Sequence, residues 1–124
     1  MRLIIAGGRD FEDKVSACTE FLNFVKEVTY PKLSKACPFT EIVSGGAKGA
    51  DRVGEYVAKF FGLPVKQFIP DWDGLGKRAG FVRNAEMAAN ADALLAFWDK
   101  NSKGTAHMIQ TAKQKGLIVK VVYY

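Results

Sequence analysis

The chain has 124 residues, the length of one ordinary domain, so we expect a single domain over residues 1–124. Hydrophobic residues make up 48% and charged residues 25% of the sequence, close to globular averages, which excludes wholesale disorder. The net charge of +5 allows an anionic partner such as a nucleotide, a nucleic acid or a phosphorylated metabolite, and is equally compatible with a basic surface that only keeps the protein dissolved.

Apolar runs that predict strands alternate along the chain with stretches of helical periodicity. The expected strands are residues 3–6, 41–43, 65–69, 93–98 and 117–123, and the expected helices are about residues 15–28, 49–61, 78–90 and 105–115. In the first helix, apolar residues recur at steps of three and four and predict the stripe that faces the core: Val15, Cys18, Leu22, Val25 and Val28. Residues 30–39 and 71–76 predict loops.

This alternation of strands and helices, ending on a strand, predicts an α/β domain with a parallel sheet and helices on both faces. Right-handed crossovers make such a sheet doubly wound. Every loop that follows a strand then lies along one edge, and ligands bind there, where the strand order reverses.

The sequence also indicates what the domain lacks. No apolar run approaches the ~18–20 residues of a membrane span. We therefore expect no membrane partner and a cytoplasmic protein. Cys18 and Cys37 form no CxxC pair and His107 is the sole histidine, which argues against zinc and for reduced thiols. The prediction includes no metal and no cofactor.

Three of the four loops on the expected ligand edge are rich in glycine: residues 7–11, 44–51 and 99–105. Glycine lets the backbone adopt positive φ and approach a ligand closely, and a helix start offers unpaired N–H groups to phosphate or carboxylate. Tight turns also need glycine, so turn geometry alone stays an alternative. Neither GxGxxG nor GxxxxGK[ST] is present, which disfavours a dinucleotide fingerprint and a P-loop.

Polar side chains in the first two loops suit a phosphorylated ligand. Arg9 and Lys48 are candidates to hold phosphate, although Arg9 could instead pair with Asp10. Asp51 lies at a helix start, where its carboxylate would cap backbone N–H groups or accept from ribose hydroxyls. Ser44 could donate its hydroxyl to phosphate or simply form a turn.

The third loop combines two hydroxyls, Ser102 and Thr105, with Gly104 at a helix start and predicts a compact phosphate cradle; the alternative is that a hydroxyl only caps the helix. Trp72 and Trp98 follow strand ends, where an indole can stack on a base or pack at the rim. The predicted ligand-binding residues are Gly7, Gly8, Arg9, Asp10, Ser44, Gly45, Gly46, Lys48, Gly49, Asp51, Trp72, Arg83, Asn84, Trp98, Ser102, Gly104 and Thr105.

These motifs resemble a known family along nearly the whole chain. Gly7-Gly8-Arg9-Asp10-Phe11, Ser44-Gly45-Gly46-Ala47-Lys48-Gly49-Ala50-Asp51, Asp71-Trp72, Arg83-Asn84 with Met87, Ala91-Asp92, and Phe97-Trp98-Asp99 leading to Ser102-Lys103-Gly104-Thr105 resemble the YspA-like branch of the SLOG superfamily. That superfamily includes the LOG or lysine decarboxylase-like phosphoribohydrolases and the DNA-processing protein DprA/Smf. The resemblance implies a Rossmann-like sheet ordered 3-2-1-4-5 that binds nucleotides or nucleotide-derived ligands.

The resemblance also bears on catalysis. In LOG-type hydrolases an arginine-lysine motif matches Arg83-Asn84, with Asn84 in place of the lysine, and the catalytic glutamate falls on Met108. A thioether can neither activate water nor stabilise an oxocarbenium ion, so whether the chain is an enzyme stays open. If it cleaves a nucleotide N-glycosidic bond, the candidates for catalysis are Arg83, Glu86, Asp10 and Asp99.

Three functions follow as expectations. The first is binding of a nucleotide-like small molecule, as a sensor or a sequestering protein linked to phage or bacterial defence. The second is nucleotide N-glycosidase activity, and the third is DprA-like binding of single-stranded nucleic acid. Members of the superfamily that the chain resembles often form dimers through their helices, so the resemblance also implies a homodimer.

Overall fold

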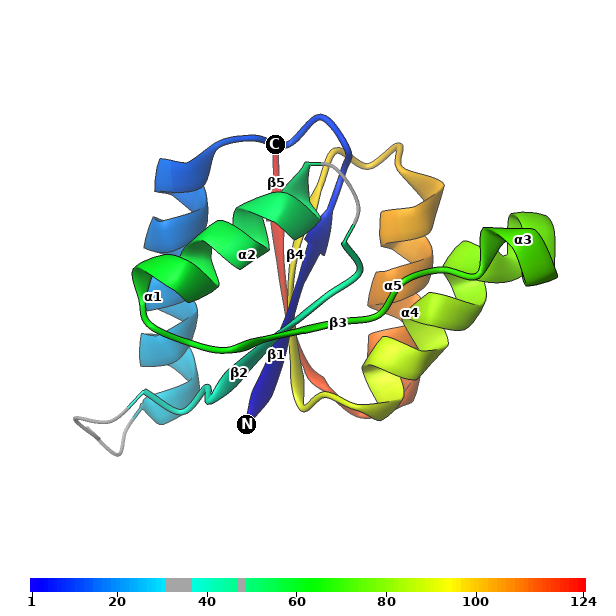
Figure 1. Cartoon of the computed structure of the whole chain (residues 1–124). Coiled ribbons are helices and arrows are strands. Elements are labelled where there is room, and N and C mark those ends of the chain that lie inside the picture. Colours follow the sequence, from blue (N-terminus) through cyan, green and yellow to red (C-terminus); the bar gives the residue numbers. More distant parts are fainter. Residues whose placement is uncertain (31–36, 47–48) are drawn as a thin grey trace.

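The computed structural model describes residues 1–30, 37–46 and 49–124, and in this part of the chain it contains one parallel five-stranded sheet (Figure 1). The strand order is β3-β2-β1-β4-β5, which confirms the predicted α/β, Rossmann-like topology. The strands are β1 (Arg2–Gly7), β2 (Glu41–Ser44), β3 (Val65–Gln67), β4 (Ala93–Trp98) and β5 (Ile118–Tyr123).

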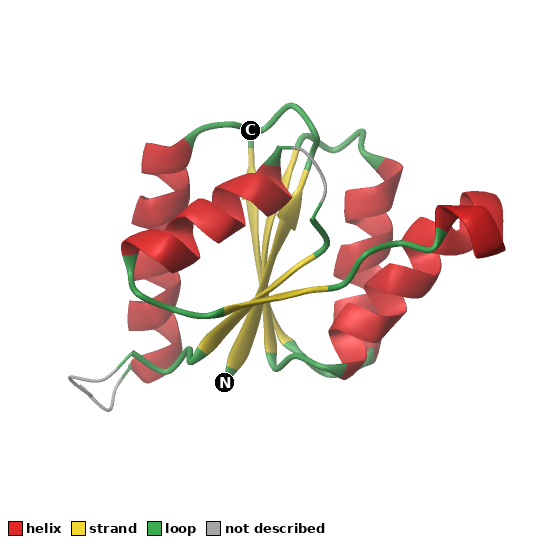
Figure 2. Cartoon of the chain, in the orientation of Figure 1, coloured by secondary structure: helices red, strands yellow, loops and turns green. Residues whose placement is uncertain are grey.

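Helices cover both faces of the sheet (Figure 2). One face carries α1 (Lys14–Thr29) and α2 (Ala50–Phe60), and the other carries α4 (Ala79–Ala89) and α5 (Lys103–Gln114). This doubly wound arrangement follows from the strand order, because the chain moves outward from β1 to β3 and then crosses to β4 on the other side of β1.

The two central strands are apolar on both faces because each face lies under helices. In β1 the side chains of Leu3 and Ile5 belong to the core beneath α1 and α2, whereas Ile4 and Ala6 belong to the core beneath α4 and α5. β4 lies beside β1 in register, with Leu3 opposite Ala93. Buried parallel strands need this uninterrupted apolar composition.

The core-facing side of α1 differs from the predicted stripe. Phe21 and Phe24 are 1% and 2% exposed, whereas Val15 and Leu22 are 79% and 46% exposed. Cys18, Val25 and Val28 are only partly buried against the same core. The helix is therefore turned by about one residue relative to the predicted stripe. The turn buries the aromatic rings, and a phenyl ring removes more apolar area from water than valine does.

Two boundaries after α2 also differ from the predictions. β3 ends at Gln67 rather than at residue 69, and all three of its residues are exposed, as befits a short edge strand. The predicted loop 71–76 contains a short helix, α3 (Trp72–Leu75), followed by a 3₁₀ turn (Gly76–Arg78). Asp71 starts α3, because its carboxylate accepts from the N–H of Gly74 at 2.9 Å.

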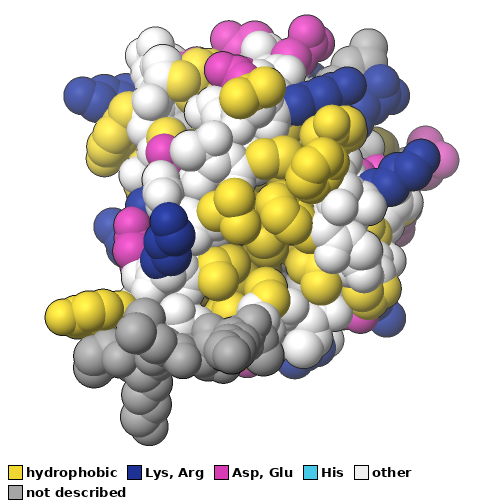
Figure 3. Space-filling model, turned by 90° about the vertical axis from the view of Figure 1, so that its left-hand side faces the viewer, with side chains coloured by type: hydrophobic (Ala, Val, Ile, Leu, Met, Phe, Trp, Pro, Cys, Tyr) yellow, Lys and Arg dark blue, Asp and Glu magenta, His cyan; other side chains and the backbone are white. Residues whose placement is uncertain are grey.

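The outer surface of α1 and α2 carries exposed apolar side chains, which gather in the middle of the face in Figure 3. Val15 and Leu22 lie on α1, and Tyr56 and Phe60 on α2, with Phe60 66% exposed. Within residues 1–30, 37–46 and 49–124, no helix has the length and apolar character that crossing a membrane requires.

Candidate functional site

A cleft of about 950 Å³ opens at the carboxyl edge of the sheet, over the boundary between β1 and β4. This is the topological switch point, where the connections leave the sheet in opposite directions and the helices separate. The lining comes from the loops at that edge and from α2, α3, α4 and α5: Ala6, Gly7, Gly8, Arg9, Asp10, Gly45, Gly46, Asp51, Arg52, Ile69, Pro70, Trp72, Lys77, Gly80, Phe81, Arg83, Asn84, Met87, Asp99, Ser102, Gly104, Thr105 and Met108.

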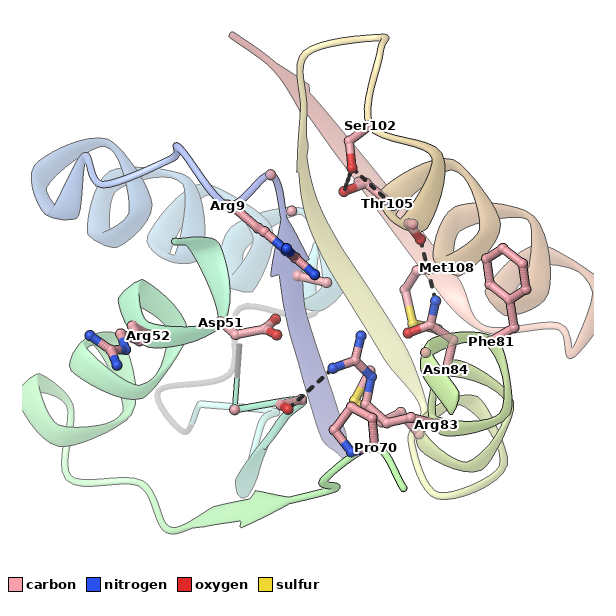
Figure 4. Close-up of a pocket in the computed structure, with 18 of the residues that line it drawn as sticks. Arg9, Asp51, Arg52, Pro70, Phe81, Arg83, Asn84, Ser102, Thr105 and Met108 are labelled. Atoms are coloured by element: carbon pink, nitrogen blue, oxygen red, sulfur yellow. Dashed lines mark hydrogen bonds between the residues drawn. The ribbon is translucent and has the colours of Figure 1, made fainter. Parts of the chain in front are cut away.

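Three charged side chains converge on the centre of the cleft from three different elements. Figure 4 shows Arg9 from the loop after β1, Asp51 from the start of α2 and Arg83 from α4 extending toward the same space. Arg9 is exposed and Asp51 is 5% exposed. The centre therefore presents two guanidinium groups beside one carboxylate, a charge pattern that suits an anion with attached hydroxyl groups.

Arg83 is held against the second glycine loop. Its Nη1 donates to the carbonyl of Gly45 at 3.2 Å, and a Cβ on Gly45 would lie 2.6 Å from that nitrogen. Glycine at position 45 therefore makes room for the guanidinium. Burial lowers the pKa of Arg83, Asp51 raises it, and the positive charge of Arg9 lowers it. The Nε of Arg83 is buried with no hydrogen-bond partner among the described residues, so the cleft contains one unsatisfied donor.

The first glycine loop is packed by the protein's own atoms. A Cβ on Gly8 would lie 2.0 Å from the hydroxyl oxygen of Tyr124, and that hydroxyl donates to Asp10 Oδ1 at 2.5 Å. Partial burial and this hydrogen bond raise the pKa of Tyr124, which keeps the donor proton on the phenol. Asp10 is thus held by Tyr124 and not by its neighbour Arg9.

The second glycine loop is anchored by Ser44, which is fully buried. Its hydroxyl donates to Glu55 Oε2 at 2.7 Å and accepts from the N–H of Gly46 at 3.1 Å. Ser44 therefore shapes the loop from beneath and does not line the cleft. Lys48, predicted to hold phosphate, lies outside the described residues.

The third loop forms its own turn and helix cap. Asp99 Oδ1 accepts from the N–H groups of Asn101 and Ser102, both at 2.8 Å, and these bonds lower the pKa of Asp99. Ser102 is the N-cap of α5 and accepts from the N–H of Thr105 at 3.3 Å. Lys103 and Gly104 are the first two residues of α5. Their backbone N–H groups have no acceptor within the helix, because no helical carbonyl precedes them.

Among the predicted site residues that the structure describes, four lie outside the cleft lining. Trp98 donates from its indole to the carbonyl of Ser102 at 3.1 Å and so holds the third loop from behind. Gly49 packs against the backbone of Gly8 and Arg9, Ser44 lies beneath its loop, and Glu86 is an exposed residue of α4. Asp10 and Asp99 line the cleft, and so does the buried thioether of Met108.

On the side of the cleft built from α3 and α4, the predictions included Trp72, Arg83 and Asn84 but missed Lys77, Gly80 and Phe81. Phe81 and Trp72, 48% and 53% exposed, stand at the mouth of the cleft with Lys77 and Gly80. The other lining residues without a predicted role are Ala6, Arg52, Ile69, Pro70 and Met87. Phe81 lies two positions before Arg83 on the same helix, and this closeness of an aromatic residue to a predicted site residue was the signal available in the sequence.

A phage protein resembles the chain along almost its whole length. The "Gene 61 protein" of Mycobacterium phage D29 is 31% identical over 124 aligned residues, covering 95% of this chain and 93% of the phage protein. The chain belongs to this phage protein family. No family model matches it, and neither does any solved structure. The family name states no activity, so the chemistry rests on the cleft.

Proposed function

We propose that the cleft binds a nucleotide or a nucleotide-derived ligand in the cytoplasm, as a sensor or a sequestering protein of the phage–bacterium conflict. The observation that carries the proposal is the pair Arg9 and Arg83 at the topological switch point, facing the start of α5 across the cleft. Guanidinium groups bind phosphate through two parallel N–H···O bonds, and the first N–H groups of a helix favour the same charge.

The other parts of the cleft suit the rest of a nucleotide. Trp72 and Phe81 offer partly exposed ring faces at the mouth, and stacking of a base on an aromatic ring contributes about 1–3 kcal/mol. The resemblance to the SLOG superfamily supports the same ligand class. In this proposal the phosphate lies between the arginines and α5, and the base lies against the rings.

Binding without hydrolysis is favoured over N-glycosidase activity by the state of the carboxylates. Asp99 is engaged by two N–H groups and its pKa is lowered, which is the opposite of what a general acid needs. Asp10 is engaged by Tyr124, and Met108 supplies no acid or base.

The test is native mass spectrometry of the freshly purified protein, followed by calorimetric titration with nucleoside monophosphates, ADP-ribose and NAD. We expect a co-purified or titrated nucleotide that Arg83→Gln binds at least tenfold more weakly, because one phosphate contact is lost. The mass also reports whether the predicted homodimer forms.

Three outcomes would overturn the proposal. Release of free base during incubation, seen by chromatography, would assign an enzyme. A gel shift of single-stranded DNA with steep salt dependence, together with no nucleotide binding, would assign a nucleic-acid protein. Failure of every small molecule and of DNA to bind would leave the cleft without this role.

A further inference from the structure

The inference concerns Asn84, a buried amide on α4 at the wall of the cleft, and it rests on the proposed function. Asn84 is 3% exposed, and its Nδ2 lies 3.3 Å from the carbonyl oxygen of Gly104 and 3.2 Å from Nδ1 of His107. In LOG-type hydrolases the matching motif has a lysine here. The substitution exchanges a cation for a group that can accept as well as donate.

The orientation of the amide is fixed by chemistry. A backbone carbonyl only accepts, so the atom of Asn84 that faces Gly104 must be the NH₂ group. Both N–H bonds of that group are then used, one on Gly104 and one on His107. Oδ1 remains, and among the described residues no hydrogen bond satisfies it. Figure 4 shows the Asn84 oxygen on the cleft side of the amide.

His107 must take a defined protonation state to hold this orientation. Because Asn84 donates to Nδ1, that nitrogen is the acceptor, and the imidazole proton lies on Nε2, which faces Thr111 Oγ1 at 3.5 Å. The ring packs on Phe81 with the centroids 4.3 Å apart. Burial lowers the pKa of His107, which favours the same neutral form.

We infer that Asn84 Oδ1 accepts a hydrogen bond from a sugar hydroxyl of the bound nucleotide, and that His107 is the positioning residue that keeps this oxygen turned to the cleft. An unprotonated phosphate oxygen cannot donate to Oδ1 and is disfavoured there. Asn84 contacts the carbonyl of Gly104 in the first turn of α5, and the part of a nucleotide next to its phosphate is the ribose. The cleft therefore discriminates ribonucleotides from analogues that lack the hydroxyls.

The test measures this discrimination in four proteins. The wild type, Asn84→Ala, His107→Phe and His107→Asn are titrated with AMP, GMP, CMP and UMP and with their 2′,3′-dideoxy counterparts. For the nucleotide that binds, the wild type should prefer the ribose form by about five- to tenfold, the effect of one hydrogen bond. Asn84→Ala and His107→Phe should lose the preference. His107→Asn should keep it, because its amide oxygen can replace Nδ1 as acceptor.

The matched pair at position 107 separates positioning from packing, since phenylalanine keeps the stacking on Phe81 but offers no acceptor. Nitrogen NMR of the imidazole gives a readout that needs no ligand, and the Nε2–H tautomer is expected. An Nδ1–H tautomer, or equal affinity of the wild type for both sugar forms, would overturn the inference alone. Absence of binding by all these compounds and by ADP-ribose and NAD would overturn the proposed function and the inference with it.

Discussion

The first and third glycine loops flank the same cleft, yet their glycines meet different surroundings. A Cβ on Gly7 would lie 2.3 Å from the carbonyl oxygen of Phe97, and one on Gly49, which packs on the first loop, would lie 2.4 Å from that of Gly8. A Cβ on Gly104 would meet nothing within 4 Å. The fold itself therefore requires the glycines around the first loop. It places no such demand on position 104, where the open space belongs to the cleft.

The largest effect on stability is expected at Gly49. Its φ of +77° and ψ of −127° lie in a region that side chains rarely adopt, and its neighbours are backbone atoms that cannot move aside. Gly49→Ala should lower the free energy of unfolding by about 3 kcal/mol or more. Urea unfolding measures this loss, and a value below about 1 kcal/mol would remove the contrast between the crowded glycines around the first loop and the open position 104.

Gly104→Asp should affect binding and not folding. The added carboxylate has room and lies at a helix start, where negative charge stabilises, so the melting temperature should stay within a few degrees. Nucleotide affinity should fall by about tenfold or more, because like charges repel in the cleft. Gly104→Asn is the matched control, equal in size and neutral. Equal losses in both variants would assign the effect to bulk, and retained binding in Gly104→Asp would place the phosphate elsewhere.

A smaller effect is expected at Gly8, where the obstacle is the end of a side chain. Gly8→Ala should displace the Tyr124 hydroxyl and break its bond to Asp10, and Tyr124→Phe removes that bond directly. Each change should cost about 1 kcal/mol. In a double-mutant cycle the combined cost should be well below the sum, since both act on one hydrogen bond. If the costs of the two changes simply add, the side chain at position 8 must instead clash with backbone atoms, as one at position 49 does.

The smallest effect is the pH dependence contributed by the third loop. The N–H groups of Ser102 and Asn101 lower the pKa of Asp99 below its ordinary value, so the folded state favours the carboxylate. This stabilisation is present above the unfolded-state pKa and is lost as the pH falls through the lower folded-state value. Unfolding of the wild type and Asp99→Asn should therefore differ more at about pH 6 than at about pH 3. A difference in unfolding free energy that does not change with pH would contradict this prediction.

The sheet could be predicted because its signals are local. Strands such as β4 consist of an unbroken apolar run, and glycine or proline marks the ends of most elements. The buried side of α1 could not be predicted in the same way. Val15 and Leu22 fit a helical stripe as well as Phe21 and Phe24 do, and only packing against the rest of the core decides between them.

The cleft was predictable in its position and only partly in its residues. The loop after each strand and the switch point follow from topology, which brings Arg9, Asp51 and Arg83 together. Contacts between distant parts of the sequence give no such signal. Tyr124 on Asp10 joins residues 114 positions apart, and nothing in either segment alone predicts that bond. The expectation that the protein binds no metal stays a prediction.

The indole bond from Trp98 to the carbonyl of Ser102 gives the molecule a built-in optical reporter. The sequence has two tryptophans, and they stand in different environments: Trp98 is half-buried behind the start of α5, and Trp72 is 53% exposed in the cleft lining. Their fluorescence should therefore separate by emission wavelength and by acrylamide quenching. A ligand that stacks at the rim would change the red-shifted emission of Trp72, whereas one that disturbs the third loop would change the bluer emission of Trp98.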